Sequence, residues 1–151
     1  MTTITFRDDI MASDSRETTA CDGESAMVIT DDCTKIHRLP DGSLFGASCG
    51  SEDIERLYKS LVDNLPPPKL EDINALMVKP DGSIWLYEGN IWQLIRQKYY
   101  SVGSGSLFAF AAMDAGASAI EAAEIGAKRD PFSGGKVINL RLRKKKKDPD
   151  A

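Results

Sequence analysis

The chain begins Met1-Thr2-Thr3-Ile4-Thr5-Phe6-Arg7-Asp8-Asp9-Ile10-Met11-Ala12-Ser13-Asp14-Ser15-Arg16. The short runs Thr3–Arg7 and Ile10–Ser13 flank Asp8-Asp9, so we predict two β-strands joined by a tight turn. Removal of Met1 would place the hydroxyl and the free α-amine of Thr2 on one residue, which combines a nucleophile with a base. The ordinary pKa of an α-amine, about 7.7–8, suits a general base near neutral pH.

Two further hairpins are predicted from a repeated turn sequence. A polar loop over Arg16–Ser25 precedes them. Ile36–Leu39 and Leu44–Ala47 flank Pro40-Asp41-Gly42-Ser43, and Leu76–Lys79 and Ile84–Tyr87 flank Pro80-Asp81-Gly82-Ser83. Proline fixes φ at the first turn position and glycine accepts a positive φ, so both tetrapeptides favour turns.

Three helices and a last strand complete the predicted order. Asp53–Leu65 has an apolar stripe, with Ser51 as its cap and Pro66-Pro67-Pro68 as its stop. Helices are also predicted over Leu107–Ala115 and from the capping box Ser118-Ala-Ile-Glu121 to Lys128, and a strand over Val137–Leu142. This order predicts an α+β fold of two antiparallel sheets flanked by helical layers.

Length and composition favour one soluble domain. The 151 residues are 42% hydrophobic and 28% charged, with no apolar run of about 20 residues and no secretory signal. Cys21, Cys33 and Cys49 are odd in number and lack CxxC spacing, so we expect reduced thiols in a cytoplasmic protein and no zinc site.

Charge is divided unevenly along the chain. The first 140 residues hold 13 basic and 21 acidic residues, whereas residues 141–151 hold six basic and two acidic ones. An acidic body argues against nucleic-acid binding by the fold. The lysine run could contact RNA, an acidic partner or a membrane surface, but we favour a solvated, disordered tail over residues 143–151 and one domain over residues 1–142.

Five motifs occur in a telling order along the chain. They are Thr2-Thr3-Ile4, Asp14-Ser15-Arg16, Lys35, Val102-Gly103-Ser104-Gly105-Ser106 and Arg129-Asp130-Pro131-Phe132-Ser133-Gly134-Gly135. Each motif alone is weak, but together they make the chain resemble a proteasome β-type subunit, in the family that includes the bacterial peptidase HslV. The resemblance covers about Thr2 to Leu142.

The resemblance implies a four-layer αββα sandwich of the N-terminal-nucleophile hydrolases and a set of catalytic roles. Thr2 would attack the scissile carbonyl, while its amine takes the proton, directly or through a water. Lys35 would lower the pKa values of the amine and the hydroxyl, and Asp14 would orient Lys35. Ser104, Asp130 and Ser133 would form the hydrogen-bond network around the free terminus.

The family pattern also implies a binding region for substrate. An oxyanion-hole N–H would come from Gly46-Ala47-Ser48-Cys49-Gly50, with Cys49 as the best match and with Ala47, Gly50 and Ser51 beside it. Such a donor contributes roughly 2.7–4 kcal/mol of transition-state stabilisation. Thr18 would lie at the substrate-binding edge.

Several residues have simpler interpretations. Asp14 could be a turn residue paired with Arg16, Lys35 a surface lysine, and Ser104 a helix cap. We interpret His37, the single histidine, as a packing or pocket-wall residue. Cys49 as a nucleophile lacks a histidine partner in the sequence pattern.

The chain also departs from the family pattern. Pro66–Asp72 replaces the second of two long helices, so one helical layer is reduced. Cys49 stands where the family has glycine, which narrows its backbone options. The first hairpin is short and Thr18–Met27 is long, so cleavage preference does not carry over. Met1 directly precedes Thr2, which predicts maturation by methionine removal rather than from a propeptide.

The implied function is a cytoplasmic, threonine-type endopeptidase that hydrolyses peptide bonds of unfolded proteins. The resemblance implies a homo-oligomeric ring and a separate AAA+ unfoldase ATPase for ATP-dependent proteolysis, because this chain has no P-loop. No cofactor, metal, nucleic acid or membrane is expected. The alternatives are a non-catalytic ring or scaffold subunit and a small-molecule amidase of the same fold.

Overall fold

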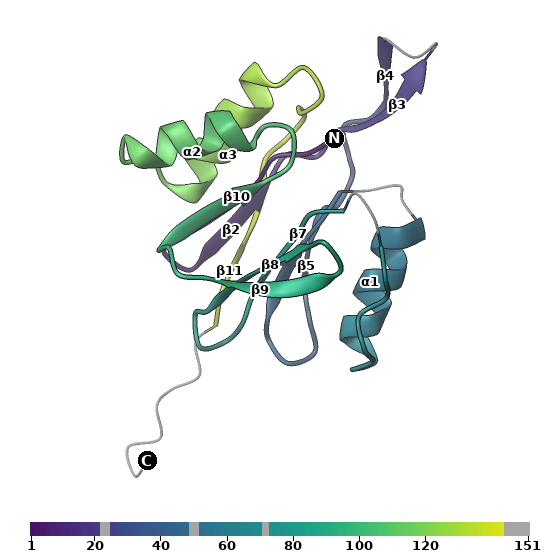
Figure 1. Cartoon of the computed structure of the whole chain (residues 1–151). Coiled ribbons are helices and arrows are strands. Elements are labelled where there is room, and N and C mark those ends of the chain that lie inside the picture. Colours follow the sequence, from purple (N-terminus) through teal and green to yellow (C-terminus); the bar gives the residue numbers. More distant parts are fainter. Residues whose placement is uncertain (22–24, 49–51, 71–72, 144–151) are drawn as a thin grey trace.

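The chain folds as an α+β protein with three helices and three antiparallel sheets in the part that the structure describes (Figure 1). That part of the computed structural model comprises residues 1–21, 25–48, 52–70 and 73–143. The first sheet has the strand order β10-β1-β2-β11. Its strands are β1 (Ile4–Arg7), β2 (Ile10–Ser13), β10 (Tyr99–Val102) and β11 (Ile138–Arg141).

The predicted opening hairpin is confirmed. Strands β1 and β2 pair in antiparallel register from Ile4 opposite Ser13 to Arg7 opposite Ile10. Asp8 and Asp9 have φ values of 50° and 66°, so both turn residues are left-handed. Two successive left-handed residues are typical of a type I′ turn, whose twist matches that of the flanking strands.

The second sheet has five strands in chain order. They are β5 (Ile36–Arg38), β6 (Leu44–Gly46), β7 (Ala75–Val78), β8 (Ile84–Glu88) and β9 (Ile91–Ile95). Both Pro-Asp-Gly turns form as predicted: Gly42 and Gly82 have φ values of 91° and 87°. In each turn the aspartate Oδ1 accepts a 2.8 Å hydrogen bond from the backbone N–H of the following serine.

The main core lies between these two sheets. Buried side chains of the first sheet meet buried side chains of the second in one cluster. The cluster contains Ile4, Phe6, Met11, Ile36, Leu44, Leu76, Val78, Ile84, Leu86, Val102 and Leu142. The sheets therefore pack face to face, and burial of this apolar surface is the largest stabilising contribution to the fold.

Helices cover the outer faces of the two sheets (Figure 1). On the first sheet, α2 (Ser106–Asp114) and α3 (Ala119–Arg129) pack closely, with Ala12 of β2 against Ala119 and Ala123. The predicted capping box of α3 is present, with Ser118 and Glu121 bonded reciprocally. On the second sheet, α1 (Glu52–Val62) packs through the buried Leu57.

Helix α1 ends before the proline run that was predicted to stop it. Asn64 has a φ of 53°, and the Leu65 N–H donates to the Ser60 carbonyl at 2.8 Å. A left-handed residue with such a bond is a common helix end, so local capping stops α1. The chain then runs in extended form along the sheet, where the Tyr87 hydroxyl donates to the Pro68 carbonyl at 2.6 Å. Residues 66–70 form neither helix nor strand.

The prediction of a polar loop over Arg16–Ser25 is wrong. Strands β3 (Glu17–Cys21) and β4 (Ser25–Thr30) form a separate two-stranded sheet that projects from the body (Figure 1). β-Branched residues favour strands even when they are polar, and β3 contains Thr18 and Thr19.

The expectation of three reduced thiols is also wrong, because Cys33 is disulfide-bonded. Cysteine spacing in the sequence does not reveal which thiols the fold brings within bonding distance. Among the described residues, no helix is both long and apolar enough to cross a bilayer.

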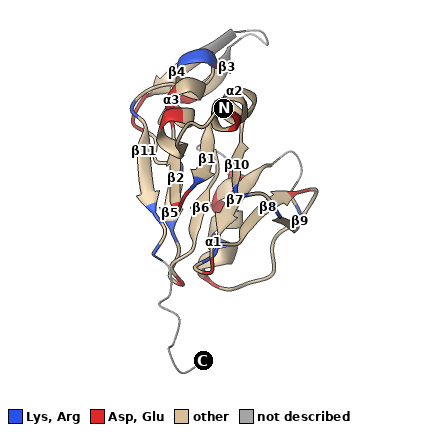
Figure 2. Cartoon of the chain, turned by 90° about the vertical axis from the view of Figure 1, so that its left-hand side faces the viewer, with Lys and Arg blue, Asp and Glu red and all other residues tan. Residues whose placement is uncertain are grey.

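The basic C-terminal stretch begins on the body of the protein. Figure 2 shows basic residues at the neighbouring ends of β5 and β11, where Arg38 Nη2 donates to the Arg141 carbonyl at 2.6 Å. The lysine run itself, in residues 144–151, lies outside the described part of the chain. The predicted disorder of residues 143–151 therefore stays a prediction.

Gly126 of α3 provides a test of how tightly this helix packs on the chain start. A Cβ atom at Gly126 would lie 2.4 Å from Thr3 Cγ2 and 2.7 Å from Thr3 Oγ1. Alanine normally favours a helix over glycine by about 1 kcal/mol. Here we expect Gly126→Ala to destabilise the protein by about 1–3 kcal/mol, because it overpacks this contact. Urea unfolding measures the change.

A double-mutant cycle identifies the cause. Thr3→Ala removes both clashing atoms, so Gly126→Ala should cost much less in the Thr3→Ala background. Equal costs in both backgrounds, or a stabilising Gly126→Ala, would contradict close packing at this position.

Candidate active site at the start of the chain

The first residues of the chain are inserted into the fold rather than left in solvent. Thr2 and Thr3 are 1% and 0% exposed. The Thr2 N–H donates to Ser104 Oγ at 3.2 Å, and the Thr2 carbonyl accepts from the Gly105 N–H at 3.2 Å. Gly103 has a φ of +100°, and a Cβ there would lie 2.0 Å from the Thr2 carbonyl oxygen. Only glycine fits this approach of two backbones.

A network of hydroxyls and one carboxylate holds the two threonines. Ser104 Oγ and Ser133 Oγ both donate to Asp130 Oδ2, at 2.5 and 2.6 Å. The hydroxyls of Thr3 and Ser133 lie 2.8 Å apart. Since the Ser133 proton points to Asp130, Thr3 is the donor in that pair. Asp130 thus orients Ser104 toward the Thr2 nitrogen and Ser133 toward the Thr3 hydroxyl.

Asp14 is a second, fully buried carboxylate with four donors. Its Oδ1 accepts from the Thr3 N–H at 3.0 Å and from Lys35 Nζ at 2.9 Å. Its Oδ2 accepts from the Gly134 N–H at 3.0 Å and from the Arg16 N–H at 3.3 Å. One side chain therefore joins β1, β2, the segment before β5 and the loop before β11.

Lys35 is 1% exposed and lies between Asp14 and the first peptide bond. Its Nζ donates to Asp14 Oδ1 and, also at 2.9 Å, to the Met1 carbonyl. The simpler interpretation of Lys35 as a surface lysine is therefore wrong. Arg16 directs its side chain to Asp31, with bonds of 2.7 and 3.0 Å, and not to Asp14.

The hydroxyl of Thr2 has a partner that sequence reasoning missed. Thr2 Oγ1 donates to Ser48 Oγ at 2.8 Å. Ser48 lies in the loop after β6, beside Ala47, whose N–H donates to the Lys35 carbonyl at 3.0 Å. The family resemblance assigned an oxyanion N–H to this loop. The sequence contains no signal that the Ser48 side chain would face Thr2.

Burial changes the ionisation of two groups here. Desolvation, with a contribution from nearby Lys35, lowers the pKa of the Met1 amine below its usual value. Desolvation also lowers the pKa of Lys35, and the charge and hydrogen bond of Asp14 oppose that shift. The site therefore shifts its amines toward the neutral form, and Asp14 favours the Lys35 ammonium.

Several solved structures share this fold. HslV from Trypanosoma brucei matches with a TM-score of 0.62 and 17% identity, over 93% of this chain and 98% of that one. Thiobacillus denitrificans BPH matches with a TM-score of 0.60 and 20% identity, over 93% and 97%. The chain has the fold of HslV- and proteasome-type peptidases.

A structure of Thiobacillus denitrificans BPH in complex with epoxomicin also matches, with a TM-score of 0.60, 21% identity and coverage of 93% and 98%. No protein-family model matches the sequence, and a search of curated proteins gives no match. At these identities the likeness establishes the fold, and the chemistry has to be argued from the residues of this chain.

The structure brings most of the predicted site residues together. The six predicted catalytic residues form the two connected networks around Thr2 and Thr3 described above. They are Thr2, Asp14, Lys35, Ser104, Asp130 and Ser133. Ser104 does not cap α2, since that helix begins without a side-chain cap.

The structure describes only two of the predicted substrate-binding residues, Ala47 and Thr18. Ala47 is buried at the edge of the site and uses its N–H within the fold. Thr18 lies on the projecting β3, opposite Val28. Cys49, Gly50 and Ser51 lie outside the described residues, so the expected oxyanion N–H stays a prediction.

His37 lies apart from this site. Its ring stacks at a tilt on Tyr58 of α1, with centroids 4.9 Å apart. Desolvation lowers the pKa of His37, so the neutral form is favoured. These contacts are those of the packing residue that the sequence predicted.

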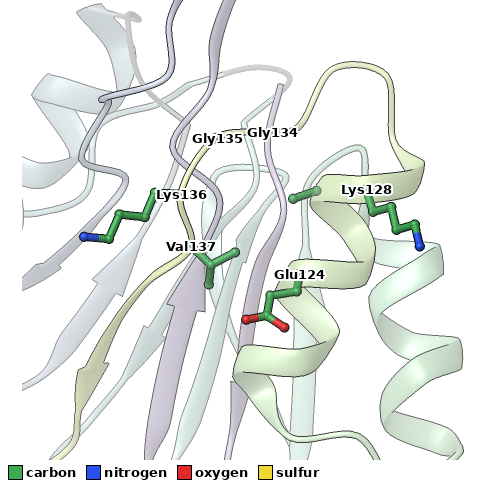
Figure 3. Close-up of a pocket in the computed structure, with 7 residues that line it drawn as sticks. Glu124, Lys128, Gly134, Gly135, Lys136 and Val137 are labelled. Atoms are coloured by element: carbon green, nitrogen blue, oxygen red, sulfur yellow. The ribbon is translucent and has the colours of Figure 1, made fainter.

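A separate surface cavity borders the Asp14 network at Gly134. It has a volume of about 440 Å³ and is bounded by α3 and the segment leading to β11. Glu124 points into it, while Lys128 and Lys136 point outward on either side (Figure 3). Gly134 is the residue that it shares with the Asp14 network. Within the described chain, no group of three or more His, Cys, Asp or Glu side chains could hold a metal ion.

The four donors of Asp14 predict a large effect of its replacement. Asp14→Asn removes the charge opposite Lys35 and turns an NH₂ group toward N–H donors. We expect a loss of about 3–5 kcal/mol in the free energy of unfolding, because one member of a buried pair is left uncompensated.

Asp31→Asn is the matched control, since it removes a carboxylate from an ion pair at the surface. We expect little change there, because exposed pairs contribute little. Urea unfolding of both variants decides the point. Similar losses in the free energy of unfolding for the two variants would show that Asp14 stabilises the fold no more than a surface carboxylate does.

Proposed function

We propose that this chain is a threonine-type endopeptidase of the HslV and proteasome kind, with Thr2 as the nucleophile once the Met1–Thr2 bond is cleaved. The observation that carries the proposal is the placement of Thr2. Its N–H donates to Ser104, whose hydroxyl donates to Asp130. The preceding Met1 carbonyl accepts from Lys35, which also donates to Asp14. Cleavage would turn that nitrogen into an amine beside an ammonium group.

The reaction follows from this arrangement. Thr2 Oγ1 attacks the substrate carbonyl carbon, and its proton passes to the freed α-amine. The nearby Lys35 charge keeps that amine in its basic form. The amine then protonates the leaving nitrogen as the peptide bond breaks, which leaves an ester on Thr2. Water, activated by the same amine, hydrolyses the ester and restores the hydroxyl.

The predicted αββα sandwich with one reduced helical layer is part of the proposal. Face-to-face packing of the two sheets and the outer positions of the helices support it. The extended segment beside α1 supports the reduced layer.

We also propose assembly into a homo-oligomeric ring that receives unfolded polypeptide from a separate AAA+ unfoldase. Helix α2 carries no charged side chain before Asp114, and its Leu107 and Phe108 are exposed. Contact with a second copy would remove that apolar surface from water. The net negative body supports the expectation of no nucleic-acid partner. A cytoplasmic location stays part of the proposal, although the Cys33 disulfide argues against it.

The first test uses epoxomicin on protein that lacks Met1. We expect one adduct on Thr2, identified by intact mass and peptide sequencing, together with hydrolysis of unfolded protein substrates. Thr2→Val keeps the shape without the hydroxyl and should give neither result. A Met1-free protein that forms no adduct would exclude the threonine peptidase and favour a scaffold subunit. An adduct with turnover of small amides only would favour an amidase.

The second test concerns Ser48, which receives the hydrogen bond of the Thr2 hydroxyl. Loss of one neutral hydrogen bond, about 0.5–1.5 kcal/mol, corresponds to a rate change of roughly 2–13-fold. We expect Ser48→Ala to slow epoxomicin modification by this factor and to lower kcat more than it changes KM. Ser48→Thr, which keeps a hydroxyl, should recover the rate. An unchanged rate of epoxomicin modification in Ser48→Ala would show that Ser48 does not assist the Thr2 hydroxyl.

A further inference from the structure

Strand β9 leaves one edge of the second sheet open. It is the last strand of that sheet, and β8 is its only neighbour among the described strands. Its register with β8 is continuous, from Ile91 opposite Glu88 to Ile95 opposite Ile84. Figure 2 shows β9 at the outer side of the molecule. Natural proteins usually protect such an edge with charged side chains, proline, a bulge or a covering segment, because unpaired backbone groups invite pairing with another strand.

In the described part of the chain, β9 has none of these protections. Its sequence, Ile91-Trp92-Gln93-Leu94-Ile95, contains no charged residue and no proline. Ile91 and Leu94 are 57% and 43% exposed, and Gln93 is exposed as well. An uncovered edge strand thus presents apolar side chains to water, and pairing with another strand would remove this apolar surface from water.

The turn before β9 determines which of its backbone groups face outward. Gly89 and Asn90 have φ values of 61° and 71°, as in a two-residue type I′ turn. The residues that flank such a turn form a hydrogen-bonded pair, and hydrogen-bonded pairs then alternate with non-hydrogen-bonded pairs along the strands. Every second residue from Ile91 therefore bonds to β8, and the N–H and C=O groups of Trp92 and Leu94 face away from it.

The strand is complementary to itself when two copies run antiparallel. Read from either end, it has an isoleucine, then a large apolar side chain (Trp92 or Leu94), and then Gln93 at the centre. Its start adjoins the exposed Glu88, and its end adjoins the exposed Arg96. An antiparallel partner would bring each glutamate near an arginine, whereas a parallel partner would bring like charges together.

We propose that β9 pairs with β9 of a second copy of this chain, antiparallel and about a two-fold axis through Gln93. Trp92 of each copy lies opposite Leu94 of the other, and their outward N–H and C=O groups exchange hydrogen bonds. Ile91 lies opposite Ile95 of the second copy. The contact joins two five-stranded sheets into one. One surface patch serves both copies, as in other isologous dimers.

Cross-linking tests the register of this pair. Gln93 would face its own counterpart across the two-fold axis as a non-hydrogen-bonded pair, with Cα atoms about 4.5 Å apart, which is within the range of a disulfide. We expect Gln93→Cys to form an intermolecular disulfide under mild oxidation, seen as a covalent dimer on a non-reducing gel. The unmodified chain measures any cross-linking through the native cysteines.

Ile91→Cys is the matched control on the same strand. The two Ile91 positions would be offset by four residues across the pair, or about 13 Å at about 3.4 Å per residue. Ile91 is also well exposed, so chance collisions would cross-link it readily. We expect Ile91→Cys to form the covalent dimer at least about 10-fold more slowly than Gln93→Cys, because its thiols are held beyond bonding distance.

Leu94→Lys tests the contact without a cross-link. It places one ammonium group of each copy in the paired edge, which is a common protection of natural edge strands. Light scattering should give half the molar mass of the unmodified protein, whether the unit that remains is a single chain or a ring. Leu65→Lys is the matched control and should keep the full mass, because Leu65 is an exposed leucine outside the sheet.

Equal rates of dimer formation in Gln93→Cys and Ile91→Cys, or no dimer in either, would overturn the proposal. An unchanged molar mass in a folded Leu94→Lys variant would overturn it too. The cross-linking result decides the question even where Leu94→Lys fails to fold. Epoxomicin modification reports on Thr2 alone, so its failure would refute the proposed function and leave the β9 pairing standing.

Discussion

The buried carboxylate of Asp14 is the contact on which the rest of this site depends. A charge at 0% exposure is tolerated only when donors surround it, and here a lysine and three backbone N–H groups do so. These donors come from four separate stretches of chain. The ion pair with Lys35 therefore fixes the second sheet relative to the chain start. Asp130 has the matching role on the helical side, where it orients two serines.

The carboxylates of Asp14 and Asp130 both help to position Thr2. The Thr2 nitrogen and hydroxyl bond to two serine hydroxyls, and its carbonyl fills the space beside Gly103. Lys35 binds the carbonyl that precedes it. Such placement is expected of a group that must react without reorganisation. It also explains why Thr2 and Thr3 are as deeply buried as the residues of the core.

Much of this arrangement could be predicted from sequence, because its signals are local or ordered. The Asp-Asp turn, the two Pro-Asp-Gly turns and the Ser118 capping box act within a few residues, and the structure contains them all. The family resemblance carried by the five motifs implied which distant residues meet. Three features were not predicted. The β3–β4 hairpin was interpreted as a loop because its residues are polar, although Thr18 and Thr19 favour a strand. The Cys33 disulfide and the Ser48 contact depend on tertiary proximity.

The single helix on the second sheet has a consequence for how such a protein can change. Among the described residues, none of the side chains that bond to Thr2 or to the Met1 carbonyl comes from α1 or from the extended segment beside it. That layer contacts the site through the sheet, by way of residues such as Ala47 and Leu57. Changes in this layer can therefore leave the position of Thr2 as it is. Evolution, or an engineer, has in this layer a surface that can be rebuilt for new neighbours while the reactive centre stays as it is.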